Sequence, residues 1–128
     1  MQRDRRLQEL TKGEEEVMQI LWEIGSGTIN DIIARMDEPK PKYTTVATFV
    51  KLLENKEFVG HTAQGKSFIY SPRVERESYA GRRLDSMLST YFGGSLSQLV
   101  NFFAEREDVS VEEMDSILQL IERAKQQE

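Results

Sequence analysis

Cysteine is absent from this chain of 128 residues, and histidine occurs only once. Without a thiol, the sequence excludes a disulfide framework, a thiolate metal site and a cysteine nucleophile. The single histidine, His61, has no second histidine with which to bind a metal and no triad context for catalysis. A Gly-rich phosphate loop is also missing. These absences predict a protein that is not an enzyme and that needs neither a cofactor nor a metal.

Long apolar runs are missing as well. No run approaches the roughly 20 residues that span a bilayer, and the charged segment Met1–Arg6 lacks the apolar stretch of a secretion signal. We therefore expect no membrane insertion and a cytoplasmic location. Hydrophobic residues make up 38% of the chain and charged residues 30%, which is typical of a soluble globular protein.

The first half of the chain contains three helical patterns. Thr11 and Glu14 have the spacing of a capping box, and apolar residues follow them at helical intervals. A second helix is predicted over residues 28–36, and a third begins at about Thr44. The side chains expected in the core share the spacing i, i+3, i+4, i+7 and are Val17, Ile20, Leu21, Ile24, Ile29, Ile32, Ile33, Met36, Val46, Phe49, Val50 and Leu53.

The outward face of the third helix is rich in threonine. A threonine hydroxyl can bond to phosphate or base edges, its methyl group can meet a thymine methyl, and alanine permits close approach. Thr44 or Thr45 also lies at the helix start, where free N–H groups favour a phosphate. A plain alternative is that the two threonines only cap the helix and that this face is solvated. The residues predicted to contact DNA here are Lys42, Thr44, Thr45, Ala47, Thr48 and Lys51.

Two β-prone segments follow, over residues 58–62 and 67–70, around the turn Ala63-Gln64-Gly65-Lys66. Lys66 lies beside this turn, where a wing would touch the DNA backbone. Between residues 40 and 66, five lysines oppose two glutamates, a net charge of +3, although the whole chain carries −5. DNA affinity depends on which cations face the phosphates rather than on total charge. Residues 1–72 are therefore predicted to form a winged helix-turn-helix DNA-binding domain.

A three-helix dimerisation region is predicted over residues 73–128. Ser95 with Gln98, and Ser110 with Glu113, have the spacing of capping boxes. Three short helices this apolar cannot easily hide every face within one chain, which favours a homodimer. The alternative is that they pack back onto the winged helix in a monomer. The side chains predicted to form the dimer are Leu84, Leu88, Tyr91, Leu96, Leu99, Val100, Phe103, Ile117, Leu120 and Ile121.

The predicted fold is thus mainly α with a small β-hairpin, a winged helix-turn-helix followed by a helical dimerisation region. Two recognition helices about one DNA turn apart would read a pseudo-palindromic operator, and separating the subunits would lose both half-sites together. The acidic total charge leaves one alternative function. In it, the winged helix contacts another protein and binds no DNA.

Four segments, in the right order, resemble the penicillinase-repressor family (BlaI/MecI/CopY). They read LTKGEEEVMQILW (10–22), PKPKYTTVAT (39–48), YSP (70–72) and FGGS (92–95). The resemblance implies a homodimeric repressor that binds double-stranded operator DNA and controls antibiotic-resistance genes. It also implies relief by cleavage, triggered by a membrane sensor-protease system. Family repressors are cut near an Asn-Phe bond in the dimerisation region, which implies Asn101–Phe102 as the cleavage bond here.

The chain departs from this family in three places. The copper-sensing branch carries a C-terminal cysteine cluster, so the absence of cysteine excludes copper control by that route. Many relatives have a basic residue late in the recognition helix, where this chain has Leu52. Relatives often have glycine after that helix, where this chain has Glu57. A left-handed conformation at Glu57 would carry some strain.

Overall fold

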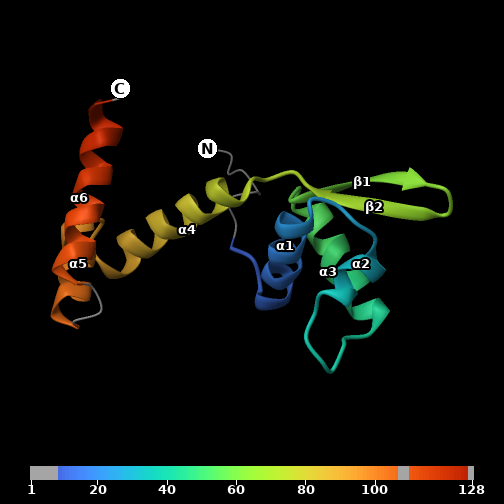
Figure 1. Ribbon diagram of the computed structural model, residues 1–128. Helices are drawn as coiled ribbons and strands as arrows, with labels where there is room; N and C mark the ends of the chain where they lie inside the picture. Colours follow the sequence, from blue (N-terminus) through green and yellow to red (C-terminus); the bar gives the residue numbers. More distant parts are fainter. Residues whose placement is uncertain (1–8, 107–109, 127–128) are drawn as a thin grey trace, which may run out of the picture. The chain divides into compact units, whose positions relative to one another are not determined.

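The computed structural model describes residues 9–106 and 110–126, and within them the fold is mainly α with one small hairpin, as predicted. The chain divides into two compact units, a first unit that ends at Arg83 and a second that begins at Leu84. No helix among the described residues is long and apolar enough to cross a membrane. The elements, drawn in Figure 1, are α1 Lys12–Ile24, α2 Ile29–Ala34, α3 Tyr43–Asn55, β1 Val59–Gln64, β2 Ser67–Pro72, α4 Arg76–Tyr91, α5 Leu96–Glu105 and α6 Val111–Gln126.

Threonine caps set the starts of α1 and α2. Thr11 forms a complete capping box with Glu14, as predicted, and Thr28 forms a second one with Asp31. In each box the hydroxyl and the carboxylate satisfy backbone N–H groups that a helix start leaves without partners. The third helix differs, because α3 begins at Tyr43 and its cap residue makes no side-chain hydrogen bond. The capping part of the plain alternative, in which Thr44 or Thr45 caps this helix, is therefore wrong.

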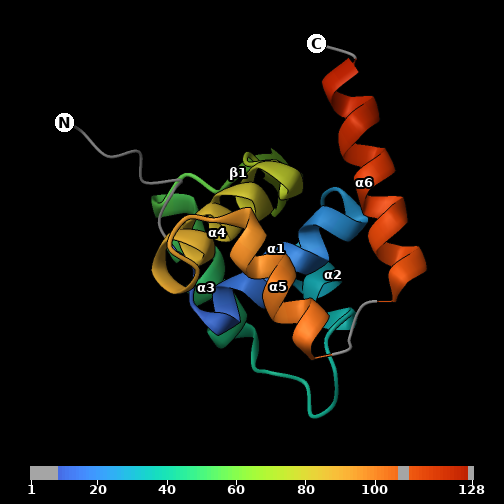
Figure 2. The same cartoon turned by 90° about the vertical axis from the view of Figure 1, so that its left-hand side faces the viewer.

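The core of the first unit lies among α1, α2, α3 and the base of the hairpin. These three helices stay together in both views of the ribbon (Figures 1 and 2). Helical spacing predicted most of the buried side chains, but Ile24, Ile33 and Phe49 are only partly buried. The ring of Phe49 packs against Gly13, where an added Cβ would lie 2.3 Å from the ring carbon Cζ. Glycine at this position therefore lets α1 and α3 approach closely.

The hairpin is longer than the predicted segments and its turn is tighter. Gln64 pairs with Ser67, so the connection consists of Gly65 and Lys66. Gly65 has a φ of 62°, a conformation that glycine adopts without steric cost. At its base, β2 also pairs with the segment before α2, since the N–H of Gly27 donates to the Tyr70 carbonyl at 3.0 Å and the reverse bond measures 2.8 Å. Three helices and this hairpin form a winged helix-turn-helix.

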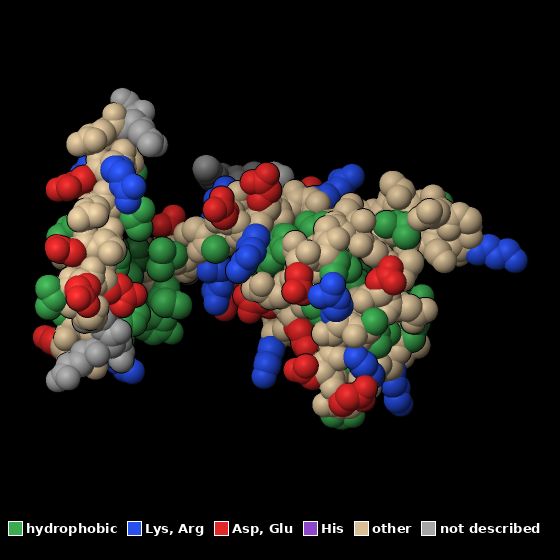
Figure 3. Space-filling model, viewed as in Figure 1, with side chains coloured by type: hydrophobic (Ala, Val, Ile, Leu, Met, Phe, Trp, Pro, Cys, Tyr) green, Lys and Arg blue, Asp and Glu red, His purple; other side chains and the backbone are tan. Residues whose placement is uncertain are grey.

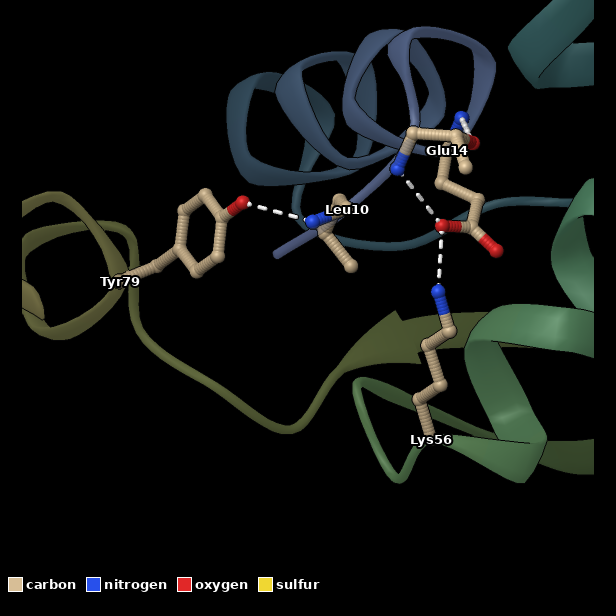
Figure 4. A network of polar contacts seen from close by, with 5 residues as sticks. Leu10, Glu14, Lys56 and Tyr79 are labelled. Carbon is tan, nitrogen blue, oxygen red and sulfur yellow. Dashed lines mark hydrogen bonds and ion pairs between the residues drawn. The ribbon is translucent and has the colours of Figure 1, made fainter. Parts of the chain in front are cut away.

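The first turn of α4 completes the core through Tyr79, which the sequence patterns did not single out. The Tyr79 side chain is 4% exposed. Its hydroxyl accepts a hydrogen bond of 3.1 Å from the Leu10 N–H (Figure 4). Its ring packs edge-on against Phe58, with the centroids 5.5 Å apart, and lies 6.0 Å from the Trp22 ring. The chain therefore folds back onto the start of α1 after leaving the hairpin.

Glu14 is the one buried charged side chain among the described residues, with 1% of it exposed. Its carboxylate accepts a hydrogen bond of 2.9 Å from the Thr11 N–H and pairs at 2.7 Å with the Lys56 ammonium group, as Figure 4 shows. Burial raises the pKa of Glu14, but the hydrogen bonds from Lys56 and Thr11 and the charge of Lys56 outweigh it, so the net pKa is lowered. One carboxylate thus joins the start of α1 to the end of α3.

We predict that Glu14→Gln destabilises the protein by about 2 kcal/mol, because it leaves a partly buried ammonium group without its counter-charge. The lowered pKa means that the pair stabilises the fold above pH 4.5 and is lost as the pH falls further. The difference from the unchanged protein should therefore shrink below pH 4.5. Urea denaturation at several pH values measures it. Glu16→Gln, on the exposed side of the same helix, is the matched control; equal effects of both variants would refute the role of the pair.

Glu57 adopts the left-handed conformation that the family comparison suggested for this position. Its φ is 67°, and it is the only residue other than glycine with a positive φ among those described. Immediately after it, the Phe58 N–H donates to the Leu53 carbonyl at 2.9 Å and so closes the end of α3. The strain at Glu57 is therefore set by the way in which α3 joins the hairpin.

Glu57→Gly should stabilise the protein by about 1 kcal/mol, since glycine adopts this conformation without the clash of a Cβ atom. The Glu57 side chain is exposed, so little packing is lost. A higher midpoint of thermal unfolding checks the gain. Glu57→Ala separates backbone strain from charge, because it removes the carboxylate and keeps the Cβ. A gain as large for alanine as for glycine would contradict the role of strain.

Candidate nucleic-acid interface

The predicted recognition face of α3 is largely open to solvent. Lys42, Thr44, Thr45, Thr48 and Lys51 are all exposed. Ala47 is the exception, because its methyl group is partly buried and packs against the core. Leu52 belongs to the exposed side and is 42% exposed. The face therefore presents three hydroxyls, two cations and one apolar side chain to a ligand.

The Thr48 hydroxyl has a defined orientation on this face. It donates a hydrogen bond of 2.9 Å to the Thr44 carbonyl one turn earlier in α3. A hydroxyl that donates to its own helix keeps its lone pairs free to accept from another donor. Thr48 thus offers an acceptor and a methyl group, which suit the amino group of adenine or cytosine and the methyl group of thymine.

Only three of the five lysines between residues 40 and 66 are free to meet an anion. The Lys40 ammonium group donates to the Ala34 carbonyl at 3.1 Å and also to the Met36 carbonyl, and Lys56 pairs with Glu14. The other three make no hydrogen bond or ion pair with any residue that the structure describes: Lys42, Lys51 and Lys66. The cations at the start and middle of α3 and in the hairpin turn are therefore the ones available to phosphates.

Lys66 stands in the two-residue turn of the hairpin, as far from the helices as the first unit reaches. Figure 3 shows a basic side chain extending beyond this tip. A cation at the end of a projecting hairpin can reach a phosphate that the helix face does not touch. The wing and α3 together therefore offer positive charge at two separate points.

His61 lies on strand β1 with its side chain exposed. Its ring lies 4.8 Å from the Phe68 ring and 5.7 Å from the Tyr70 ring, and its Nδ1 contacts the Glu54 carboxylate on α3. Burial, followed by the charge of Glu54, raises the pKa of Tyr70. Glu54 is thus engaged with the hairpin. No group of three or more metal-binding side chains occurs among the described residues.

A groove lies between the starts of α2 and α3 and the strand β2, with a volume of about 260 Å³. Its walls include Asn30, Tyr43, Lys66 and Ser67. Of these, only Lys66 was among the predicted DNA-contacting residues. The others come from three different elements and share no sequence spacing, so no pattern in the sequence could have grouped them.

The second unit exposes its apolar side chains. Among the described residues, α5 and α6 bury no side chain fully. Of the ten side chains predicted to form a dimer, Leu88, Leu99 and Val100 are half-buried and the others are exposed, with Tyr91 at 74%. Figure 3 shows hydrophobic side chains gathered beside α6 in this unit. Apolar surface this extensive is typical of an interface with another chain.

The bond between Asn101 and Phe102 lies within α5, and both side chains are exposed. The Phe102 ring contacts Phe92 and Phe103, with centroid distances of 5.7 Å and 5.6 Å, and the Arg106 guanidinium lies 5.1 Å from its centroid. A bond inside a helix becomes available to a protease when that helix opens locally.

Comparison with known proteins relates the whole arrangement to one family. The family model described as penicillinase repressor matches residues 10–123. The penicillinase repressor of Bacillus licheniformis is 27% identical over 124 residues, which cover 94% of this chain and 95% of that relative. The methicillin resistance regulatory protein MecI of Staphylococcus aureus strain N315 is 27% identical over 123 residues, covering 94% and 98% respectively.

Among solved structures, the fold is similar to the solution structure of the DNA binding domain of the repressor BlaI. The TM-score is 0.50 at 24% sequence identity, and the match covers 62% of this chain and 94% of that one. This likeness confirms the winged-helix fold.

Proposed function

Because the chain belongs to the penicillinase-repressor family, whose members are transcriptional repressors and not enzymes, we propose that it represses transcription as a homodimer bound to a pseudo-palindromic operator. Each subunit would place α3 in the major groove and the hairpin against the adjacent backbone. The operator-contacting residues would be Lys42, Thr44, Thr45, Ala47, Thr48, Lys51 and Lys66.

One observation carries the DNA-binding part of this proposal. The whole chain has a net charge of −5. Between residues 40 and 66, the lysines that remain unpaired are Lys42 and Lys51, at the start and in the middle of α3, and Lys66, at the tip of the hairpin. Several other basic side chains of the described first unit are occupied, as Lys56 is by Glu14, Arg35 by Glu23 and Arg83 by Glu9. A winged helix that contacts only another protein has no need of unpaired cations at these two points.

The dimer is supported by the state of the second unit. Its helices expose leucine, isoleucine and aromatic side chains and fully bury none in the described part. The monomeric alternative would require these side chains to be covered within one chain. A second copy of the same unit can cover them, and a symmetric pairing is the commonest solution in soluble proteins.

We expect Lys51→Ala and Lys66→Ala each to weaken binding to any duplex and to flatten its dependence on salt, because each variant removes one phosphate contact. Each lost contact should lower the slope of log affinity against log salt by about 0.9. Thr48→Ala should instead relax the choice among sites, since Thr48 faces base edges. Fluorescence anisotropy at several salt concentrations, with upstream DNA and with a scrambled duplex, measures both effects.

Lys12→Ala, at an exposed position of α1, is the matched control for a lost lysine and should leave binding unchanged. Saturation at two chains per duplex, with no comparable binding to the scramble, would support the dimeric repressor. If the folded protein bound neither duplex, a winged-helix module for protein–protein contact would replace this proposal.

The regulated genes and the relief of repression form the finer part of the proposal. Two relatives are named as a penicillinase repressor and a methicillin resistance regulator, which points to antibiotic-resistance genes. We propose that a membrane sensor-protease system relieves repression through cleavage at Asn101–Phe102. This cut would remove α6 and the end of α5 from the dimer.

A chain truncated after Asn101 should be monomeric and should bind the operator at least tenfold more weakly, since avidity is lost with the second subunit. The first unit should stay folded, because its buried side chains lie between Leu10 and Tyr79. Sedimentation measures the oligomeric state and circular dichroism the fold. A truncated chain that still forms dimers and binds with full affinity would contradict this route of relief.

A further inference from the structure

The groove beside α3 contains several polar groups without a function in the fold. Asn30, Tyr43, Lys66 and Ser67 line it, and none of their side chains makes a hydrogen bond or ion pair with any residue of the described chain. The four groups are an amide, a phenol, an ammonium group and an aliphatic hydroxyl. All four can donate a hydrogen bond, and one carries a positive charge. An anion with several acceptor oxygens matches this set.

Two aromatic rings at the groove remain open to water. Tyr43 is 53% exposed and Phe68 is 51% exposed. The Phe68 ring contacts the His61 ring, with the centroids 4.8 Å apart, but about half of its surface stays exposed. Aromatic surface next to unpaired donors suits a ligand with an apolar part bound to an anionic part. A deoxyribose joined to a phosphodiester has this composition.

The nearby carboxylates are not part of the lining of the groove. The lining residues, which all belong to the described first unit, include no Asp or Glu. Asp31, one turn into α2, receives the Thr28 N–H at 2.9 Å. Glu54 contacts His61 on the hairpin. Among the side chains that line the groove, Lys66 therefore carries the one charge.

We propose that this groove binds one phosphodiester and its deoxyribose, with Asn30, Tyr43, Lys66 and Ser67 around the phosphate and the Phe68 ring against the sugar. This inference rests on the proposed DNA binding and extends it to four residues outside the set predicted from the sequence, namely Asn30, Tyr43, Ser67 and Phe68. The groove is continuous with the recognition helix and the wing tip, because Tyr43 starts α3 and Lys66 forms the hairpin turn. A backbone held here fixes the depth and direction in which α3 enters the major groove, without reading sequence.

The test uses the full chain with Asn30, Tyr43 and Ser67 replaced together, as Asn30→Ala, Tyr43→Phe and Ser67→Ala. These substitutions remove uncharged donors at exposed positions, so circular dichroism and the unfolding midpoint should not change. We expect affinity to fall about tenfold for the operator and by the same factor for an unrelated duplex, since each lost bond is to a charged phosphate. Gln19→Ala, an exposed amide on α1, is the matched control for Asn30.

A scan of methylphosphonate substitutions along the operator locates the phosphate. At one position in each half-site, the neutral linkage should weaken binding by the unchanged protein more than binding by the triple variant, which keeps only Lys66 at that phosphate. If the folded triple variant bound both duplexes with unchanged affinity, or lost affinity for the operator alone, the groove would not hold the backbone. If the unchanged protein bound no duplex at all, the proposed function itself would fail, which is a separate result.

Discussion

The first unit depends on one buried carboxylate. A charged side chain placed in a core costs several kcal/mol unless it is paired and hydrogen-bonded, and Glu14 meets this requirement with the Thr11 N–H and the Lys56 ammonium group. Lys56 directly follows α3, so the pairing requires the end of α3 to lie against the start of α1. Gly13, beside Glu14, allows the Phe49 ring to pack closely at the same contact. The orientation of α3 thus follows in part from the pairing of this buried carboxylate.

The same demand changes what the charge of the sequence means. From the sequence alone, all five lysines between residues 40 and 66 could be expected to contribute to DNA binding. Of these, Lys56 satisfies Glu14 and Lys40 holds the carbonyl groups at the end of α2. The remaining three are spaced from the start of α3 to the tip of the wing. A DNA backbone responds to these positions rather than to the total, which is why an acidic chain can carry a basic binding face.

Local patterns predicted the fold well, whereas long-range contacts lay beyond them. The capping box at Thr11, the buried rows of α1 to α3 and the hairpin all follow from residues close in sequence. Glu14 was assigned only its capping role, because its second partner is 42 residues away. Tyr79 was missed for a similar reason, since it bonds to Leu10 across 69 residues. The groove was missed because three separate elements form it. Within the predicted site, the burial of Ala47 follows from the exact rotation of α3, which a face assigned from spacing does not define.

The unequal burial of the two units has a consequence for control. Among the described residues, every buried hydrophobic side chain lies between Leu10 and Tyr79, so the winged helix carries a complete core without the second unit. The second unit has no such core, and in the proposed dimer its stability and the pairing of subunits are the same event. Loss of pairing would then leave each winged helix folded. One duplex would contact the unpaired lysines of one subunit instead of those of two. Because each phosphate contact adds to the logarithm of affinity, halving the set weakens binding far more than twofold. In the proposed mechanism, repression would therefore be switched by pairing of the second unit, without unfolding the winged helix.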